Sequence, residues 1–174
     1  MANSSKSIVG WTDVHDGATT ALCSAEPYNS ELDTTIKLNK IQKTLRHAWL
    51  DSIDELEQKP DLLVLNGEPI DGANKKQVGQ QSWSTNLEDQ MSDFIKLSEE
   101  IPYKDIMFVR GSGYHVTLDA TNFEEVLANR LNAVRYRAYG GQGATDDYAF
   151  VEMYGKVFNF AHHIGFNKSP AYRT

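Results

Sequence analysis

Four segments of the chain carry side chains that can bind a metal ion or move a proton. Each follows a short apolar stretch, and together they contain Asp13 and His15, Glu68 and Asp71, Tyr114 and His115, and the adjacent pair His162 and His163. Four of the five histidines fall in these segments. Carboxylates and imidazoles bind divalent transition metals, and imidazole also transfers protons near neutral pH. The pattern predicts metal or acid–base chemistry.

The residues between these segments predict alternating strands and helices. Compact apolar runs at residues 7–12, 61–65 and 106–109 indicate strands, and the unbroken run 62–65 suits a strand buried on both faces. Helical spacing of apolar residues predicts helices over residues 36–56, 84–97 (with Ser84 as N-cap) and 122–133. From Tyr148 the pattern predicts a hairpin with its turn at residues 154–156. This order favours an α/β or mixed α+β layer fold.

The length of 174 residues fits one domain over residues 1–174, with residues 1–6 as a disordered polar tail. In an open α/β sheet the loops that follow the strands lie together at the carboxyl edge, where ligands bind. We therefore expect the four segments to meet at one site.

Asp13 and His15 are two residues apart, so in an extended segment their side chains point the same way and can bind one ion. The alternative is a turn in which Asp13 accepts backbone hydrogen bonds and His15 is exposed.

Glu68 follows the buried run and Gly67, and its two oxygens suit it to bridge two divalent ions. The alternative is an Asn-Gly turn that leaves Glu68 in solvent. Asp71 can orient a metal ligand by accepting a hydrogen bond from it.

The histidines differ in their expected roles. His115 follows a glycine-rich loop that lets a substrate approach the backbone, and its imidazole can donate a proton to a leaving oxygen; the alternative is a half-buried histidine paired with a carbonyl. Adjacent residues of an extended segment face opposite ways, so at most one of His162 and His163 binds a given ion. His47 lies within the first predicted helix and is expected at the surface.

The composition of the chain limits the ligands and the cellular compartment that we expect for it. With 17 basic against 24 acidic residues the net charge is −7, so a phosphate-bearing ligand needs local cations such as metal ions. A single cysteine, Cys23, and a polar start without a signal-peptide pattern favour a reducing, intracellular compartment. The longest apolar stretch, residues 62–65, is far shorter than the ~20 residues of a membrane span.

Over residues 8–174, the order of these motifs resembles the calcineurin-like metallophosphoesterases, most closely those encoded by bacteriophages and prophages. Asp13-Val14-His15 is similar to the family's Asp-x-His motif, and Gly67-Glu68-Pro69-Ile70-Asp71 to its Gly-Asp-x-x-Asp motif, with Glu68 in place of the bridging aspartate. Gly111-Ser112-Gly113-Tyr114-His115 is a looser counterpart of Gly-Asn-His, without its metal-binding asparagine. The closing Gly-His-x-His motif is absent.

The resemblance implies a residue-by-residue assignment. Asp13 and His15 would hold the first metal, Glu68 would bridge, and His162 or His163 would supply the strand-end histidine. His115 would be the catalytic acid, and Asp71, Ser112 and Tyr114 would orient ligands or contact substrate. The implied fold is a four-layer α/β/β/α sandwich. Because the chain ends before the family's last strands, we expect one sheet to be incomplete.

The resemblance implies a hydrolase that cleaves a phosphomonoester, a phosphodiester or a nucleic-acid phosphate by attack of metal-bound hydroxide, using two divalent ions (Mn, Zn, Fe or Mg). The substrate would be a phosphorylated small molecule or a nucleic acid, with no membrane partner, in the cytoplasm of a bacterial host. One alternative is a catalytically weak or inactive binding protein of the same fold in a phage nucleic-acid or assembly complex. Another, a Rossmann-like enzyme, is disfavoured because no Gly-x-Gly-x-x-Gly loop follows the first strand.

Overall fold

The computed structural model describes residues 6–73, 80–112, 117–118, 121–134 and 145–162. Its helices are α1 (Lys40–Asp54), α2 (Leu87–Glu99) and α4 (Phe123–Arg130). Its strands are β1 (Ile8–Trp11), β2 (Tyr28–Asn29), β3 (Thr34–Thr35), β4 (Leu62–Asn66), β5 (Asp105–Val109), β6 (Thr117–Leu118), β7 (Thr121–Asn122), β8 (Thr145–Asp146), β9 (Ala149–Met153) and β10 (Lys156–Phe160). The fold is mixed α/β, as predicted. None of the described helices has both the length and the apolar character needed to cross a bilayer.

A parallel sheet with strand order β1-β4-β5-β8 forms the centre of the molecule. Successive residues of β4 and β5 face opposite sides and are buried on both: Leu63 and Phe108 join the core on one face, and Val64 and Met107 the core on the other. The predicted burial of both faces is therefore confirmed. Its cause is the absence of polar residues from Leu62 to Leu65.

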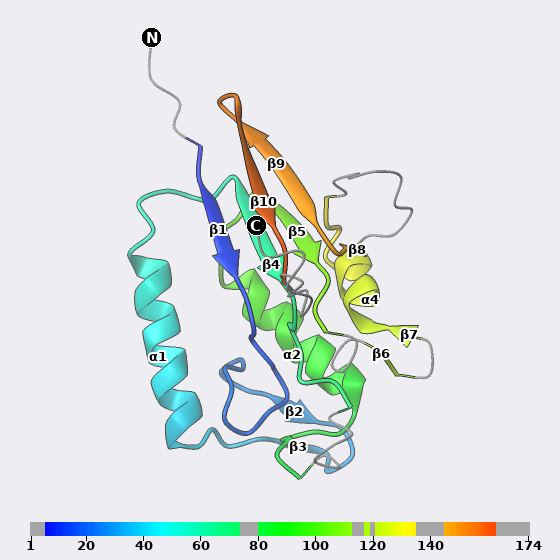
Figure 1. Ribbon diagram of the computed structural model, residues 1–174. Coiled ribbons are helices and arrows are strands. Elements are labelled where there is room, and N and C mark those ends of the chain that lie inside the picture. Colours follow the sequence, from blue (N-terminus) through cyan, green and yellow to red (C-terminus); the bar gives the residue numbers. More distant parts are fainter. Residues whose placement is uncertain (1–5, 74–79, 113–116, 119–120, 135–144, 163–174) are drawn as a thin grey trace, which may run out of the picture.

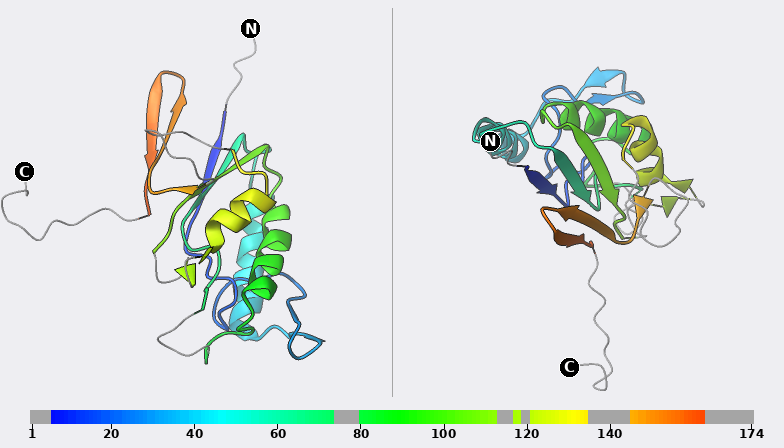
Figure 2. Two further views of the ribbon diagram at one scale, coloured as in Figure 1. Left: turned by 90° about the vertical axis from the view of Figure 1, so that its right-hand side faces the viewer. Right: turned by 90° about the horizontal axis from the view of Figure 1, so that it is seen from above.

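The two faces of the sheet are covered differently. Helices α1, α2 and α4 lie against one face, and the antiparallel β9–β10 hairpin lies against the other (Figures 1 and 2). The hairpin and its turn agree with the prediction from the sequence. The described residues form helix, sheet and hairpin layers, and the finer four-layer arrangement stays a prediction.

Two predicted helix boundaries are wrong, and side-chain capping explains both. Helix α1 begins at Lys40 rather than near residue 36, because Asn39 and Gln42 form a capping box in which each side chain accepts a hydrogen bond from the other's backbone amide. Helix α2 is capped by Asn86 instead of Ser84. The hydroxyl of Ser84 donates to Asp89 and therefore stabilises the preceding turn.

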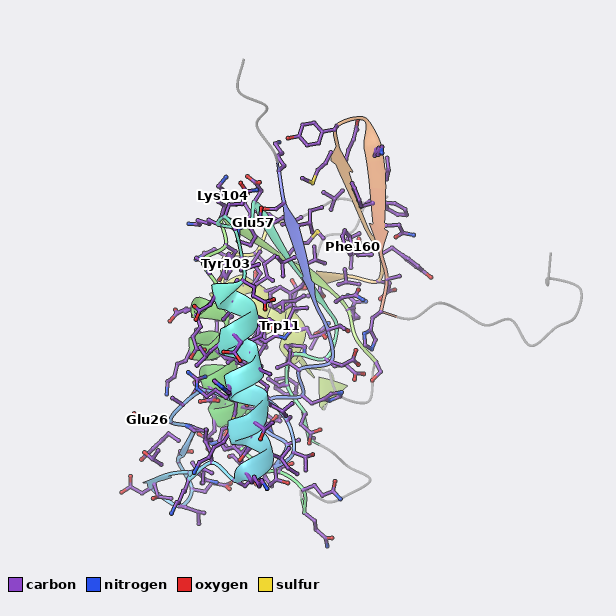
Figure 3. The ribbon with its side chains drawn as sticks, turned by 90° about the vertical axis from the view of Figure 1, so that its left-hand side faces the viewer. Trp11, Glu26, Glu57, Tyr103, Lys104 and Phe160 are labelled. Atoms are coloured by element: carbon purple, nitrogen blue, oxygen red, sulfur yellow. The ribbon has the colours of Figure 1, made fainter. Side chains whose placement is uncertain are left out.

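Trp11, the last residue of β1, joins the sheet to two helices. Its ring stacks on Trp49 of α1 with centroids 4.4 Å apart and lies 5.4 Å from the ring of Phe94 of α2. Figure 3 shows Trp11 on the helix side of the sheet, with Phe160 on the hairpin side. The stack fixes the end of β1, from which the chain enters the segment of Asp13 and His15.

We expect Trp11→Ala to lower the free energy of unfolding by ~3 kcal/mol, because it removes a large aromatic side chain from a three-element contact. Urea denaturation followed by circular dichroism measures the change. Leu50→Ala, which truncates an exposed side chain of α1, is the control and should change stability by less than ~1 kcal/mol. Equal losses in the two variants would contradict the proposed role of the stack.

Candidate metal centre

The segments that follow β1 and β4 lie side by side beyond the ends of the strands. The amide of Asp13 donates to the carbonyl of Gly67 at 3.2 Å, and the amide of His15 donates to the carbonyl of Glu68 at 3.0 Å. The hydroxyl of Thr12 donates to the carbonyl of Asn66 at 2.8 Å. Backbone pairing therefore holds the Asp13–His15 segment against Glu68.

Asp13, His15 and Glu68 adopt an unusual backbone conformation. Their φ angles are +52°, +51° and +55°, and they are three of the six non-glycine residues with positive φ in the described chain. Each such residue costs ~1 kcal/mol relative to ordinary geometry, and strain of this kind concentrates at functional sites. The segment of Asp13 and His15 is therefore not extended, contrary to the expectation from the sequence, and their ligand atoms come together with that of Glu68 on left-handed backbone.

Asp13, His15 and Glu68 form a group that can hold a metal ion. Each offers one oxygen or nitrogen ligand atom, and these atoms lie within 4.8 Å of one another. Glu68 is 6% exposed, so the alternative of a turn with Glu68 in solvent is wrong. The side chain of Asp13 is 52% exposed, which leaves the site open to solvent on that side.

The carboxylate of Glu68 lies between two imidazoles. Its Oε2 is 2.9 Å from Nε2 of His15, and its Oε1 is 3.4 Å from Nε2 of His162. The hydroxyl of Ser112 donates to the same Oε1. The two oxygens of one carboxylate thus face histidines from two different layers of the fold, the sheet and the hairpin.

The ring of His162 is oriented by the backbone of β4. Its Nδ1 lies 2.7 Å from the carbonyl oxygen of Asn66, which can only accept a hydrogen bond, so Nδ1 carries a proton. In the neutral ring this leaves Nε2, the atom that faces Glu68, as a lone-pair donor. Nε2 of His162 and Oε1 of Glu68 are then both electron-rich, and at 3.4 Å they need a proton or a metal ion between them.

Glu124, the second residue of α4, holds two of the site segments together. Its side chain is 0% exposed. Oε1 accepts hydrogen bonds from the amides of Glu68 (3.0 Å) and Gly111 (3.1 Å), and Oε2 accepts from the amide of Gly111 at 2.9 Å. A Cβ on Gly111 would lie 2.7 Å from the amide nitrogen of Glu68, so only glycine allows this approach. Burial raises the pKa of Glu124 to about 7, although both amides act in the opposite direction.

Of the other predicted site residues, Asp71 and Ser112 lie at the site, and the remaining three lie outside the described residues. Asp71 is buried, with Oδ1 3.8 Å from Nδ1 of His15, on the side of the ring that faces away from Glu68. Ser112 contacts Glu68 directly through its hydroxyl and its amide. Tyr114, His115 and His163 lie outside the described residues, as do residues 1–5 of the predicted tail. His47 is exposed on α1, as predicted.

The sequence analysis missed Glu124 and Asn66. A signal for Glu124 exists: it precedes Leu127 and Ala128 by three and four residues, so it lies on their face of the helix, and both of those residues are buried. A carboxylate on a buried helical face needs hydrogen-bond donors. The role of Asn66 depends on its backbone carbonyl, which no side-chain pattern reveals.

Comparison with known proteins adds no identification. No family model, no curated protein and no solved structure matches the chain. The site is therefore interpreted from its own geometry.

We expect Gly67→Ala to weaken metal binding, because a Cβ there would lie 2.4 Å from Nδ1 of His162 and displace the ring. Isothermal titration with Mn²⁺ should show an affinity lower by ~10-fold or more. Gly155→Ala is the matched control: Gly155 also has positive φ, +70° against +84°, but an added Cβ meets nothing within 4 Å. Gly155→Ala should lose ~1 kcal/mol of stability from its backbone strain alone, and Gly67→Ala should lose more because of the added clash. Only Gly67→Ala should lose affinity. Equal affinities would contradict the placement of His162.

Glu124 should make the metal-free protein less stable as the pH rises. Its pKa is raised from 4.5 to about 7 on folding, so the folded state binds the proton more tightly and stability falls between those pH values. The resulting decrease in the free energy of unfolding is at most about 3 kcal/mol. Urea denaturation in chelator from pH 5 to 8 should show a smaller decrease for Glu124→Gln than for the wild type. Parallel curves would contradict the assignment, since all other titrating groups are shared.

Proposed function

We propose that the protein is a metal-dependent phosphoesterase of the calcineurin-like class that hydrolyses a phosphomonoester, a phosphodiester or a nucleic-acid phosphate. The observation that carries the proposal is the carboxylate of Glu68, whose two oxygens face Nε2 of His15 and Nε2 of His162. A carboxylate between two nitrogen ligands is the arrangement expected of a group that bridges two divalent ions.

The charge of the site supports cation binding. Asp13, Glu68 and Asp71 bring three carboxyl groups around His15, in a protein with a net charge of −7. A phosphate group would be repelled from such a site unless bound cations reverse the local field. The same carboxylates that exclude phosphate from the metal-free site would thus recruit it once ions are bound.

The donor set fits two divalent ions. Carboxylate oxygens and imidazole nitrogens suit Mn, Zn or Fe, whereas Mg is less well served by histidine. The one cysteine is not available as a thiolate ligand or nucleophile: Cys23 is buried, and burial followed by repulsion from Asp16 and Asp93 raises its pKa.

The residues of the chain have separable roles in this proposal. Bound ions would supply a water of lowered pKa and stabilise the charge that develops on the phosphoryl oxygens. Asp13 and His15 would hold one ion, His162 the other, and Glu68 both. Glu124 fixes the backbone of Glu68 and Gly111, and the exposed side of Asp13 leaves an approach for substrate. The proton for the leaving oxygen is assigned to His115, by the family resemblance alone.

The same resemblance supports the finer parts of the proposal, which are the four-layer α/β/β/α sandwich and a phage or prophage origin. It also supports a phosphorylated small molecule or a nucleic acid as substrate.

The test is hydrolysis of bis-p-nitrophenyl phosphate and single-stranded DNA by the wild type with Mn²⁺ and after chelation. We expect activity that chelation abolishes, and a loss of ~100-fold or more in kcat/KM for Asp13→Ala and His162→Ala, since each removes a metal ligand. His47→Ala, which removes an exposed histidine, should keep full activity. His115→Ala should lose activity while retaining metal, which separates proton donation from metal binding.

Two results would contradict the proposal. Equal background hydrolysis in the wild type and all variants, with no metal found by elemental analysis, would exclude a metalloenzyme. Metal retention that requires Asp13 and His162, without turnover of either substrate, would instead support a binding protein of the same fold.

A further inference from the structure

A groove runs between the hairpin and the edge of the parallel sheet. It has a volume of about 520 Å³. Ile8 and Gly10 of β1 line one side, Phe158 and Phe160 of β10 line the other, and Lys6 and Lys156 are among the remaining lining residues. None of these residues belongs to the metal centre.

The hairpin covers the core beneath it unevenly. Phe158 of β10 pairs with Val151 of β9 in the antiparallel register, so both side chains point to the same face, the one turned toward the sheet. Val151 is 3% exposed, but Phe158 is 44% exposed. Val151 of β9 is therefore covered, whereas Phe158, directly opposite it on β10, borders an open groove.

Backbone groups on both sides of this groove can accept another strand. Among the described strands, β10 pairs only with β9, and β1 pairs only with β4. A Cβ added to Gly10 would meet no atom within 4 Å, so the groove has room beside β1. An unpaired strand edge beside exposed apolar side chains is the usual surface for strand addition.

Charge indicates what kind of segment fits. The ion pairs of lysine and arginine in the described chain use Arg46, Lys104, Arg110 and Arg130. The ammonium groups of Lys6 and Lys156 lie outside these pairs and border the groove. Two cations beside an apolar groove, on a protein of net charge −7, favour a segment that carries carboxylates.

The segment that follows His162 does not have this chemistry. Residues 163–174 include Lys168 and Arg173 and contain no aspartate or glutamate. Charge complementarity therefore favours a segment from another protein over this one.

We propose that the groove binds an extended segment of a partner protein that pairs with β10 as a third strand, and that this segment carries both apolar and acidic side chains on the face turned toward the groove. Its apolar side chains cover Phe158 and Ile8. Its carboxylates contact Lys156 and Lys6, each of which lies two residues before one of these apolar residues and lines the same groove. The proposal is independent of the metal centre and its chemistry.

The test uses two synthetic peptides, titrated into the full chain in the presence of chelator. Both carry threonine on the solvent face and valine at the central groove-facing positions, and the terminal groove-facing positions are glutamate in one peptide and lysine in the other. Nuclear magnetic resonance should show amide shifts along β10 with the glutamate peptide and much smaller shifts with the lysine peptide. Phe158→Glu, on the groove face, should weaken binding by about tenfold or more. Val157→Glu, the next residue but on the opposite face, should bind as the wild type does. Lys6→Glu combined with Lys156→Glu should reverse the peptide preference.

Several outcomes would overturn the proposal. No shift along β10 at millimolar peptide, or equal binding of the two peptides, would exclude an acidic strand as the occupant. Self-association in sedimentation that Phe158→Glu abolishes would assign the groove to a second copy of this chain. Peptide binding only after removal of residues 163–174 would assign it to the chain's own segment. Circular dichroism of each variant verifies that a loss of binding is not a loss of fold.

Discussion

The structure of the site depends on one requirement: the carboxylate of Glu68 must present one oxygen to His15 and the other to His162. The first histidine follows β1, and the second follows β10 in a different layer, so Glu68 has to reach both from the end of β4. Glu68 has a left-handed backbone conformation, which directs its side chain into the site. Gly67 and Gly111 provide the space, because a Cβ on Gly67 would clash with His162 and a Cβ on Gly111 would clash with Glu68. Glu124 accepts a hydrogen bond from the amide of Glu68 and thereby fixes this backbone conformation.

This requirement places negative charge where burial makes it unfavourable. Glu68 and Glu124 are both nearly inaccessible, and Asp16 beside His15 is fully buried, where burial and then repulsion from Asp93 raise its pKa well above the ordinary range. Buried carboxyl groups stay in folded proteins when hydrogen bonds, protons or cations compensate them. Glu124 is compensated by backbone amides, whereas Glu68 faces two imidazoles and a hydroxyl. The centre is thus an electrostatic arrangement that either protons or divalent cations complete.

The sequence predicted those parts of this arrangement that depend on local patterns of residues. The unbroken run Leu62–Leu65 predicted a doubly buried strand, and the placement of Asp13, His15 and Glu68 after strands predicted their convergence. It did not predict the start of α1, because the capping box of Asn39 and Gln42 outweighs the apolar periodicity that begins at Ile36. The short pairs β2–β3 and β6–β7 have too few residues for any periodic signal. Glu124 was missed because its partners are amides of other segments, which only the tertiary structure brings within reach.

Strand β10 lines the groove and leads directly into the candidate metal centre. Phe160, at the end of the strand, packs against the core beneath the hairpin, whereas Phe158 borders the groove. Two residues after the strand ends, the chain places His162 against Asn66 and Glu68. The position of that imidazole therefore depends on how the hairpin sits on the sheet, and this packing is least complete on the side of β10 that faces β1. A strand added there would extend the hairpin and bury Phe158. The strand that would pair with a partner segment is thus the same strand that leads the chain to His162 in the candidate metal centre.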